Sequence, residues 1–154
     1  MPKFIDNIVI ENARVIFKNF EGRRDTYNKN GAKTFGVIIE DVDTAHKLME
    51  DGWNIKMRPP REEGDPPRYH LPVTVSYNGP FPPTVYMITG KAKVLLDDTT
   101  IANLDHAEIE SADLVIRPYV WEVNGESGVK AYLKTMYVKI EQDEFAEKYQ
   151  EVGE

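Results

Sequence analysis

Residues 112–140 read ADLVIRPYVWEVNGESGVKAYLKTMYVKI, and this stretch predicts a long β-hairpin. Apolar side chains recur at every second position in both halves, as they do in strands with one buried face. The dipeptide Asn124-Gly125 between the halves favours a two-residue type I′ turn, because both central residues of that turn need positive φ. The turn then sets the cross-strand pairs, which are Val123 with Glu126, Tyr119 with Lys130, and Arg117 with Tyr132.

The two faces of this predicted hairpin differ in chemistry. One face is apolar and is expected to pack in the core; it holds Leu114, Ile116, Pro118, Val120, Val129, Ala131 and Leu133. The other face carries cations and large aromatic rings, which are Arg117, Tyr119, Trp121, Lys130, Tyr132 and Lys134. Single-stranded nucleic acid suits such a face, because bases stack on aromatic rings while lysine and arginine neutralise phosphates. Alternatively, the rings form cross-strand pairs that stabilise the hairpin, or they lie under a loop or a subunit contact.

A second basic and aromatic segment lies near the N-terminus. Alternation along the expected strand 8–20 gives one face with Val9, Ala13, Val15 and Phe17 and another with Arg14, Ile16, Lys18 and Phe20. The loop and strand that follow add Arg23, Arg24, Tyr27, Lys29 and Lys33. From position 14 to 33 there are six cations against two acids, a local charge of +4 in a chain of net charge -7. We expect these residues to contact a polyanion, since distant like charges are screened beyond about 10 Å at 0.1 M salt. A solvated hairpin loop is the alternative.

Two lysines elsewhere are further candidates. Lys91 and Lys93 lie in GKAKVLL and fit phosphate contacts, but they equally fit edge-strand lysines that block aggregation. Trp53, just after the glycine of DGWNIK, is expected in the core rather than on a stacking surface.

The whole chain predicts one mainly β domain of 154 residues. Strands are expected at about 8–20, 33–40, 53–58, 69–77, 84–95, 112–123 and 128–140. A short helix is expected in DTAHKLMEDG, capped by Asp43 or Thr44 and ended near Gly52, and a helical turn is expected in TTIANL after Asp97-Asp98. These short strands and Pro/Gly-rich loops favour a small antiparallel barrel of OB type with long hairpins. Residues 1–140 would form this domain, and 141–154 an acidic tail or short amphipathic helix.

The composition argues against enzymatic and metal-dependent functions. Cysteine is absent, and His46, His70 and His106 lack the spacing that places two ligands on one helix face. No phosphate-binding glycine loop or nucleophile elbow is present, so we expect no cofactor and no catalytic residues. A magnesium-dependent nuclease built on Asp97, Asp98 and Asp105 is the enzymatic alternative. No apolar run reaches the roughly 20 residues of a membrane span, and no export signal is seen, so a cytoplasmic location is expected.

Three segments together resemble the single-stranded DNA-binding proteins encoded by tailed bacteriophages. These segments are ARVIFKNFEGRRDTYNKNGAKTFGVII (13–39), DGWNIKMRPP (51–60) and IRPYVWEVNGESGVKAYLKTMYVKIEQDEFAEKY (116–149). The resemblance is one of order and composition along most of the chain. It implies an OB fold, sequence-independent binding of single-stranded DNA (ssDNA), and a role in phage DNA replication, recombination or repair in the bacterial host cytoplasm. By position, the loop of Arg23 to Lys33 and the late strand pair would line the groove.

The resemblance and the tail also bear on partners. Segment 141–154 holds six acids against one lysine, a local charge of -5, which would suit contact with phage or host replication and recombination proteins. Many related proteins close such a tail with an aromatic residue, whereas this chain ends Val152-Gly153-Glu154. The sequence leaves open a homodimer and RNA as ligand. The rival function is a structural or protein-interaction module, such as a virion component or an inhibitor of a host protein, that uses the same aromatic face.

Overall fold

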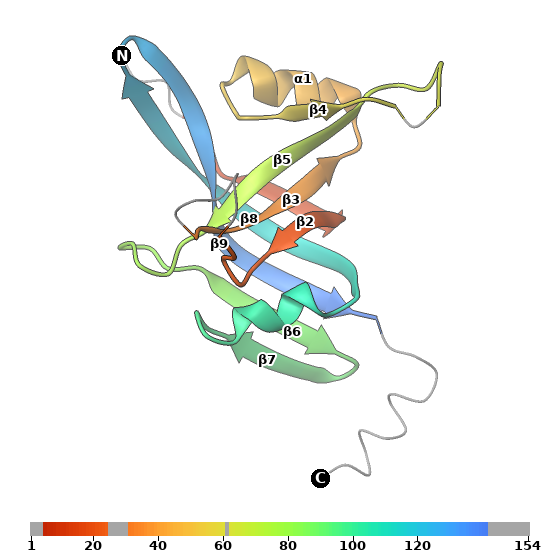
Figure 1. The fold of residues 1–154 in the computed structure, drawn as a ribbon, viewed down its shortest axis with the longest axis vertical. Helices are drawn as coiled ribbons and strands as arrows, with labels where there is room; N and C mark the ends of the chain where they lie inside the picture. The colour runs from red at the N-terminus through yellow and green to blue at the C-terminus, as the bar shows by residue number, and fades with distance from the viewer. Residues whose placement is uncertain (1–4, 25–30, 61, 142–154) are drawn as a thin grey trace.

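The computed structural model describes residues 5–24, 31–60 and 62–141. Its strands join in a single nine-stranded sheet, accompanied by one α-helix and one 3-10 helix (Figure 1). The elements in chain order are β1 (Ile8–Ala13), β2 (Val15–Asn19), β3 (Lys33–Ile39), α1 (Val42–Glu50), β4 (Lys56–Arg58), β5 (Arg68–Val75), β6 (Thr84–Thr89), β7 (Ala92–Leu96), η1 (Ile101–Asp105), β8 (Ile109–Val123) and β9 (Glu126–Ile140). The mainly β prediction is therefore confirmed.

The main path of the sheet has the topology of an OB fold. It runs β1-β8-β9-β5-β3-β2, so it begins and ends on consecutive strands that only Arg14 separates, and the sheet curls back on itself. With β1 and β2 counted as one bent strand, the path has five strands, the number in an OB barrel. β5 and β9 run parallel, while the other neighbours on the path are antiparallel. The OB-like prediction is confirmed.

The core fills the inside of this curled sheet. Its largest fully buried side chains are Phe20, Phe35, Leu71, Ile101, Leu104, Ile116, Leu133, Met136, Val37, Val73, Val85 and Val138. β5 shows the pattern most clearly, because buried and half-buried residues alternate along all of it. Each such aliphatic or aromatic side chain contributes roughly 1.5–3 kcal/mol when it is fully buried. Trp53 is also buried, as the sequence predicts.

The predicted β8–β9 hairpin forms with the expected register. Val123 pairs with Glu126, and the pairs Tyr119 with Lys130 and Arg117 with Tyr132 follow. Asn124 and Gly125 have φ of 52° and 84°, as a type I′ turn requires. The prediction that this apolar face packs in the core is wrong at Val120, which is exposed, and Pro118 is only half-buried. The hairpin extends beyond the curled sheet here, so the inner face of its tip has no strand to pack against (Figure 1).

The predicted faces of strand 8–20 are wrong in both halves. Val9 and Ala13, expected on one face, are 68% and 4% exposed, and the pairing of β1 with β8 shifts register between Ile10 and Ala13. The strand is interrupted at Arg14, and Asn12 and Phe17 have φ of 53° and 52°. The pairing of β2 with β3 also shifts register between Ile16 and Asn19. Simple alternation fails across such an irregularity, so Phe17 is 62% exposed while Phe20 is 0% exposed. Phe20 stacks on Phe35 in the core at a centroid distance of 5.2 Å.

The remaining elements match the predictions in kind but differ in detail. α1 is capped at Asp41 rather than at Asp43 or Thr44, and Gly52 follows it with φ of 99°. η1 follows Asp97-Asp98, as predicted. The expected strand 84–95 is two strands, β6 and β7, which reverse at Gly90. Within the described ranges, neither helix has the length and apolar character needed to cross a membrane.

Candidate nucleic-acid interface

The outer face of the hairpin brings four predicted residues into one cluster. The Arg117 guanidinium lies 5.2 Å from the centroid of the Tyr132 ring, and Lys130 Nζ lies 5.2 Å from the same centroid. Tyr119 meets Tyr132 edge to face, with centroids 6.0 Å apart. Phe81, which the sequence analysis did not select, packs on Arg117 at 5.3 Å. Cations held at ring faces in this way gain about 0.5–1 kcal/mol each at exposed sites, and they stay available to an anion.

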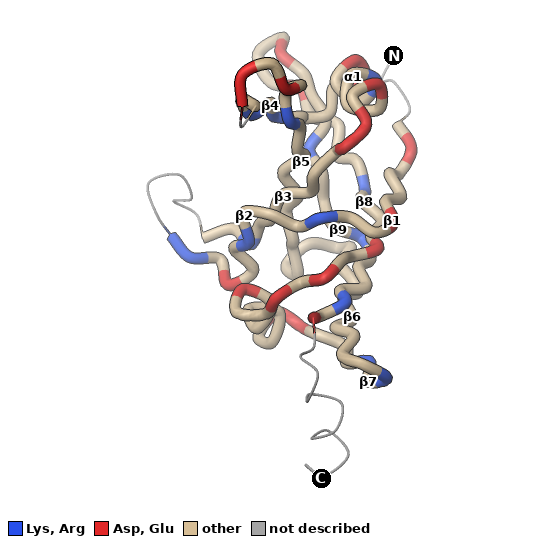
Figure 2. The backbone as a smooth tube through the Cα atoms, turned by 90° about the vertical axis from the view of Figure 1, so that its right-hand side faces the viewer, with Lys and Arg blue, Asp and Glu red and all other residues tan. Residues whose placement is uncertain are grey.

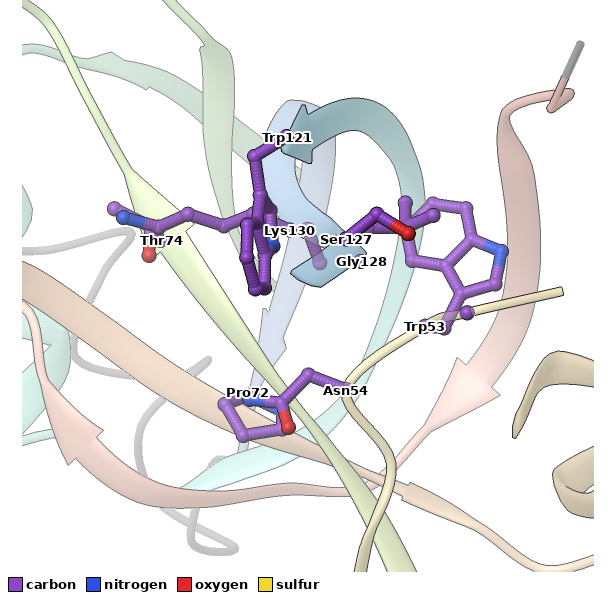
Figure 3. Close-up of a pocket in the computed structure, with 11 residues that line it drawn as sticks. Trp53, Asn54, Pro72, Thr74, Trp121, Ser127, Gly128 and Lys130 are labelled. Atoms are coloured by element: carbon purple, nitrogen blue, oxygen red, sulfur yellow. The ribbon is translucent and has the colours of Figure 1, made fainter. Parts of the chain in front are cut away.

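Trp121 lies further out on the same face and overhangs a groove. Its ring covers Gly128, where an added Cβ would lie 2.8 Å from Cζ2, so only glycine permits this close approach. The groove has a volume of about 430 Å³ and lies between the hairpin and residues 52–54, Pro72 and Thr74. Figure 3 shows the Trp121 ring projecting from the hairpin toward Pro72 and Asn54, with Lys130 beside it. Trp53 lines the groove as well, although most of its surface is buried.

The groove is open because β5 and β9 pair at a single residue position. These strands pair at Thr74 and Tyr132, and a second bridge joins Trp53 to Val129. Between these bridges the hairpin and β5 diverge, and the space between them is the groove. Thr74 also lines a second pocket of about 340 Å³, together with Tyr132 and Lys33. Thr74 lines both pockets, so they are neighbours, and we refer to the two together as the path; Lys130 lines the first pocket and Tyr132 the second.

Tyr77 closes one side of the second pocket. Its hydroxyl is buried and makes no hydrogen bond to any described residue. Burial raises the pKa of Tyr77 to about 12, with a further contribution from the carboxylates of Asp97 and Asp98. The hydroxyl therefore stays protonated and neutral at physiological pH.

A basic and aromatic patch on the outer face of β5 was missed by the sequence analysis. The exposed Phe17 ring meets His70 edge to face at 5.2 Å, and the Arg58 guanidinium lies 5.7 Å from the Phe17 centroid. Lys56 pairs with His70 across β4 and β5. Burial lowers the pKa of His70, and the charges of Arg58 and Lys56 lower it further. Pro72 and Thr74 continue this face of β5 toward the groove.

The described cations at the β2–β3 loop, Arg23, Arg24 and Lys33, differ in what they contact. Lys33 Nζ donates to the Glu21 carbonyl at 3.4 Å and lines the second pocket. Arg23 is exposed and braces the loop by donating to Asn19 Oδ1 and to the Lys18 carbonyl. Arg24 packs beside Gly31. The predicted residues Tyr27 and Lys29 lie outside the described residues.

Three residues predicted for the interface lie elsewhere. Phe20 is in the core, where no base can reach it. Lys18 donates from Nζ to the carbonyls of Leu104 and Ala107, at 3.0 and 2.6 Å, so it anchors η1 rather than facing the groove. Arg14 lines a separate pocket beside β1 and α1, together with three acids, Glu11, Glu40 and Asp41.

The other predicted lysines lie toward the opposite end of β9. Lys134 is exposed on β9 itself, next to Thr135. Lys91 follows Gly90 in the turn between β6 and β7, and Lys93 lies on β7. Lys93 Nζ is 4.6 Å from the centroid of the Tyr86 ring.

Comparison with known proteins identifies the family of this chain. Residues 2–154 match the family described as "Putative phage ssDNA-binding domain". The chain belongs to this family. The family is one of binding domains rather than enzymes. No match was found among curated proteins.

Solved structures of one phage protein share the fold. The single-stranded DNA-binding protein from bacteriophage Enc34, in a C-terminal truncation, matches with a TM-score of 0.53 and 15% identity, over 89% of this chain and 87% of that chain. The Enc34 protein in complex with ssDNA matches with a TM-score of 0.53 and 14% identity, over 89% and 88% of the two chains. At this level of identity, the likeness shows the OB-like fold of the family.

Two acidic residues of the nuclease alternative, Asp105 and Asp97, have structural roles in this family member. Asp105 accepts hydrogen bonds from the backbone N–H groups of Phe20 and Glu21, at 2.8 and 2.9 Å. Asp97 Oδ1 accepts from the N–H groups of Thr99 and Thr100, and hydrogen bonds led by the Thr99 hydroxyl lower the pKa of Asp97 to about 2. Among the residues described, no group of three or more His, Cys, Asp or Glu side chains could hold a metal ion.

Proposed function

We propose that this chain binds single-stranded DNA in the groove beside β9, largely without sequence preference. One observation carries the proposal. In this member of a family of ssDNA-binding domains, the outer face of the β8–β9 hairpin holds aromatic rings and cations together at the rim of a groove. An OB fold binds oligonucleotides on the face of its second and third strands and on the loops beside them. β3 and β5 occupy these places here, and the β2–β3 loop and the β8–β9 turn flank them.

The residues along the path divide into two chemical roles. Trp121 and Tyr132 offer ring faces to bases, and such stacking is worth roughly 1–3 kcal/mol per base. Arg117, Lys130 and Lys33 lie between or beside the rings, where they neutralise phosphates and release counterions. These contacts use features that every nucleotide has, so they give affinity without reading sequence.

This arrangement favours a single strand over a duplex. In a duplex, each base is stacked on its neighbours and paired, so its faces are not available to Trp121 or Tyr132. A flexible single strand can turn its bases toward these rings. Binding would therefore keep the strand unpaired and shield it from nucleases.

The biological role that follows is protection and organisation of ssDNA during phage DNA replication, recombination or repair, in the cytoplasm of the bacterial host. The acidic segment 141–154 would serve contacts with replication or recombination proteins, because its charge of -5 disfavours DNA and suits basic protein surfaces.

A fluorescence titration tests the proposal. A Trp53→Phe variant leaves Trp121 as the reporter, since the chain has two tryptophans. Oligo-dT, an oligo-rU strand and a duplex of equal length are added at low and at high salt. We expect quenching by oligo-dT that weakens steeply as salt rises, and much weaker binding of duplex.

Each other outcome has a definite meaning. Equal quenching by oligo-rU would extend the function to RNA. An unchanged signal with every strand, confirmed by a direct binding assay, would refute nucleic-acid binding and assign the aromatic face to protein contact.

A further inference from the structure

The β6–β7 hairpin adds a second aromatic and cationic surface outside the five-stranded path. β6 pairs with the C-terminal half of β9, and β7 pairs with β6, so the two strands widen the sheet beyond the barrel (Figure 1). Tyr86 of β6 and Tyr137 of β9 are direct neighbours in this pairing. Their rings stack at a centroid distance of 5.3 Å and an interplanar angle of 15°. Lys93 lies over Tyr86 at 4.6 Å, so the three side chains form one row.

A bulge in β9 puts this row on the same face as Tyr132. Val115 pairs with Thr135 and Ile116 with Leu133, so Lys134 has no partner in the ladder. An unbroken strand would send Tyr132 and Tyr137 to opposite faces, because side chains alternate. The extra residue changes the phase, so that Leu133, Met136 and Val138 are all buried while Tyr137 is 38% exposed. One outer surface of β9 thus carries Tyr132 and then Tyr137.

Two exposed lysines lie near the row, and two acids of the neighbouring strand β8 are already engaged. Lys93 and Lys134 are exposed beside it. Asp113 lies opposite Tyr137 on β8, and its Oδ1 accepts a hydrogen bond of 2.8 Å from the Asn12 N–H. Glu110 lies 3.9 Å from Lys139. Figure 2 shows cationic positions on β7, at the end of the molecule away from α1. This surface therefore suits an anion with flat rings.

We propose that the bound single strand leaves the groove at Tyr132 and continues onto this second surface, where a base stacks on Tyr137. This inference rests on the proposed function and extends it to a longer binding site. Lys93 lies over the Tyr86 ring at one end of the row. The Tyr137 ring, at the other end, is therefore the one on which a base can stack. Lys93 and Lys134 contact phosphates on either side. The two tyrosines are five residues apart on one strand, a span of roughly 15 Å at about 3.3 Å per residue.

Substitutions at Tyr137, combined with strands of two lengths, test this path. A strand of about 5 nucleotides fills the groove alone, and one of about 15 reaches the second surface, lengths within the range of OB sites. Tyr137→Leu removes the ring and keeps an apolar side chain, while Tyr137→Phe keeps the ring. We expect Tyr137→Leu to weaken binding of the long strand roughly tenfold and to leave the short strand unchanged. Tyr137→Phe should behave like the wild type. Thermal unfolding of each variant checks that the fold is kept.

A fluorescent label gives a readout that does not depend on affinity. The chain has no cysteine, so Leu95→Cys introduces a single attachment point. Leu95 is 60% exposed and pairs with Tyr86. The label should respond to the long strand and not to the short one, whereas Trp121 should respond to both. Val94→Cys, next to it on β7 and pointing to the other face, is the control.

The outcomes separate this inference from the proposed function. If the wild type binds both strands but Tyr137→Leu changes neither, or both equally, the second surface is not part of the path. If Tyr137→Leu instead alters sedimentation of the protein without changing DNA affinity, the surface joins two copies of the chain. If the wild type binds neither strand, the proposed function fails, and this extension fails with it.

Discussion

The β8–β9 hairpin has a base and a projecting arm, and the same alternating pattern of side chains has a different role in each. In the base, which lies in the curled sheet, Ile116 and Met136 are each 0% exposed. In the arm, which extends beyond it, Tyr119 is 52% and Trp121 36% exposed, and even the inward-facing Val120 is exposed. A strand of fixed period thus contributes packing where its inner face meets a second layer, and a binding surface where it does not. The base should therefore determine stability, and the arm affinity.

The largest effect is expected from a truncation in the base. Ile116→Ala removes a fully buried side chain and leaves a cavity, so the free energy of unfolding should fall by about 2–5 kcal/mol. The groove residues are untouched, so folded protein should keep its affinity for oligo-dT. Urea unfolding and a titration at low temperature measure the two quantities. A large loss of affinity in folded protein would show that base and arm are not separable.

The next largest effect is expected from the arm. Trp121→Ala combined with Tyr132→Ala removes two stacking surfaces, each worth roughly 1–3 kcal/mol, so affinity for oligo-dT should fall by about a hundredfold or more. The melting temperature should change little, because neither ring belongs to the core. Val123→Ala, an exposed position next to the turn, is the matched control and should retain affinity. Unchanged affinity in the folded double variant would remove the stacking hypothesis.

A smaller and chemically distinct effect is expected at Arg117. The Arg117 guanidinium lies between the rings of Phe81 and Tyr132. When Tyr132 stacks on a base, Arg117 is therefore close to the neighbouring phosphates. Arg117→Gln should lower affinity several-fold at low salt and reduce the slope of log affinity against log salt by about 1. Binding isotherms at several salt concentrations measure the slope. An unchanged slope would mean that Arg117 orients Tyr132 without contacting phosphate.

A smaller effect is expected from a change to the packing of Trp121 on Gly128. Gly128→Ala puts a methyl group where the Trp121 ring now lies, 2.8 Å from Cζ2, so the ring must move. We expect the fold to be retained, the tryptophan emission to shift, and affinity to fall only a few-fold, because the ring stays on the arm. Near-ultraviolet circular dichroism and the dT titration follow both. Wild-type spectra in this variant would show that the ring does not pack on Gly128 in solution.

The hairpin was predictable because local and long-range signals agree there. Asn124-Gly125 specifies the turn, and the turn fixes the register of the strands on either side, so Tyr119, Lys130 and Tyr132 could be placed on one face from sequence. The exposure of Val120 was not predictable in the same way, because alternation gives the face of a side chain and not whether that face meets a partner.

The irregular strands were not predictable by the same reasoning. Positive φ at Phe17 leaves no mark in the sequence, since phenylalanine is unusual in that conformation. The sequence therefore did not predict that Phe17 is exposed and Phe20 is buried. For the same reason it did not predict the surface patch of Phe17, Arg58 and His70. The bulge at Lys134, which brings Tyr137 to the outer face, is also hidden, because no glycine or proline marks it in the sequence. The parallel contact of β5 with β9 joins residues 58 positions apart, Thr74 and Tyr132.

His70 provides the smallest predicted effect and an exception to the division between stability and binding. It lies on the outer face of β5, yet its charge state should affect stability. Burial, with the neighbouring charges of Arg58 and Lys56, lowers its pKa in the folded protein below the ordinary value of about 6.5. Between the folded and unfolded pKa values, the unfolded chain binds more protons than the folded chain. The contribution of His70 to stability is therefore fully present above this pH window and is lost as pH decreases through it.

His70→Gln should therefore flatten the dependence of melting temperature on pH between about 7.5 and 5.5, since the other titrating groups cancel in the comparison with wild type. The expected change is a few degrees at most, because the side chain is only half-buried and solvent screens the charges. Thermal unfolding at closely spaced pH values measures it. Parallel curves for the two proteins would mean that His70 has the same pKa folded and unfolded, and that the outer face of β5 contributes nothing to stability through charge.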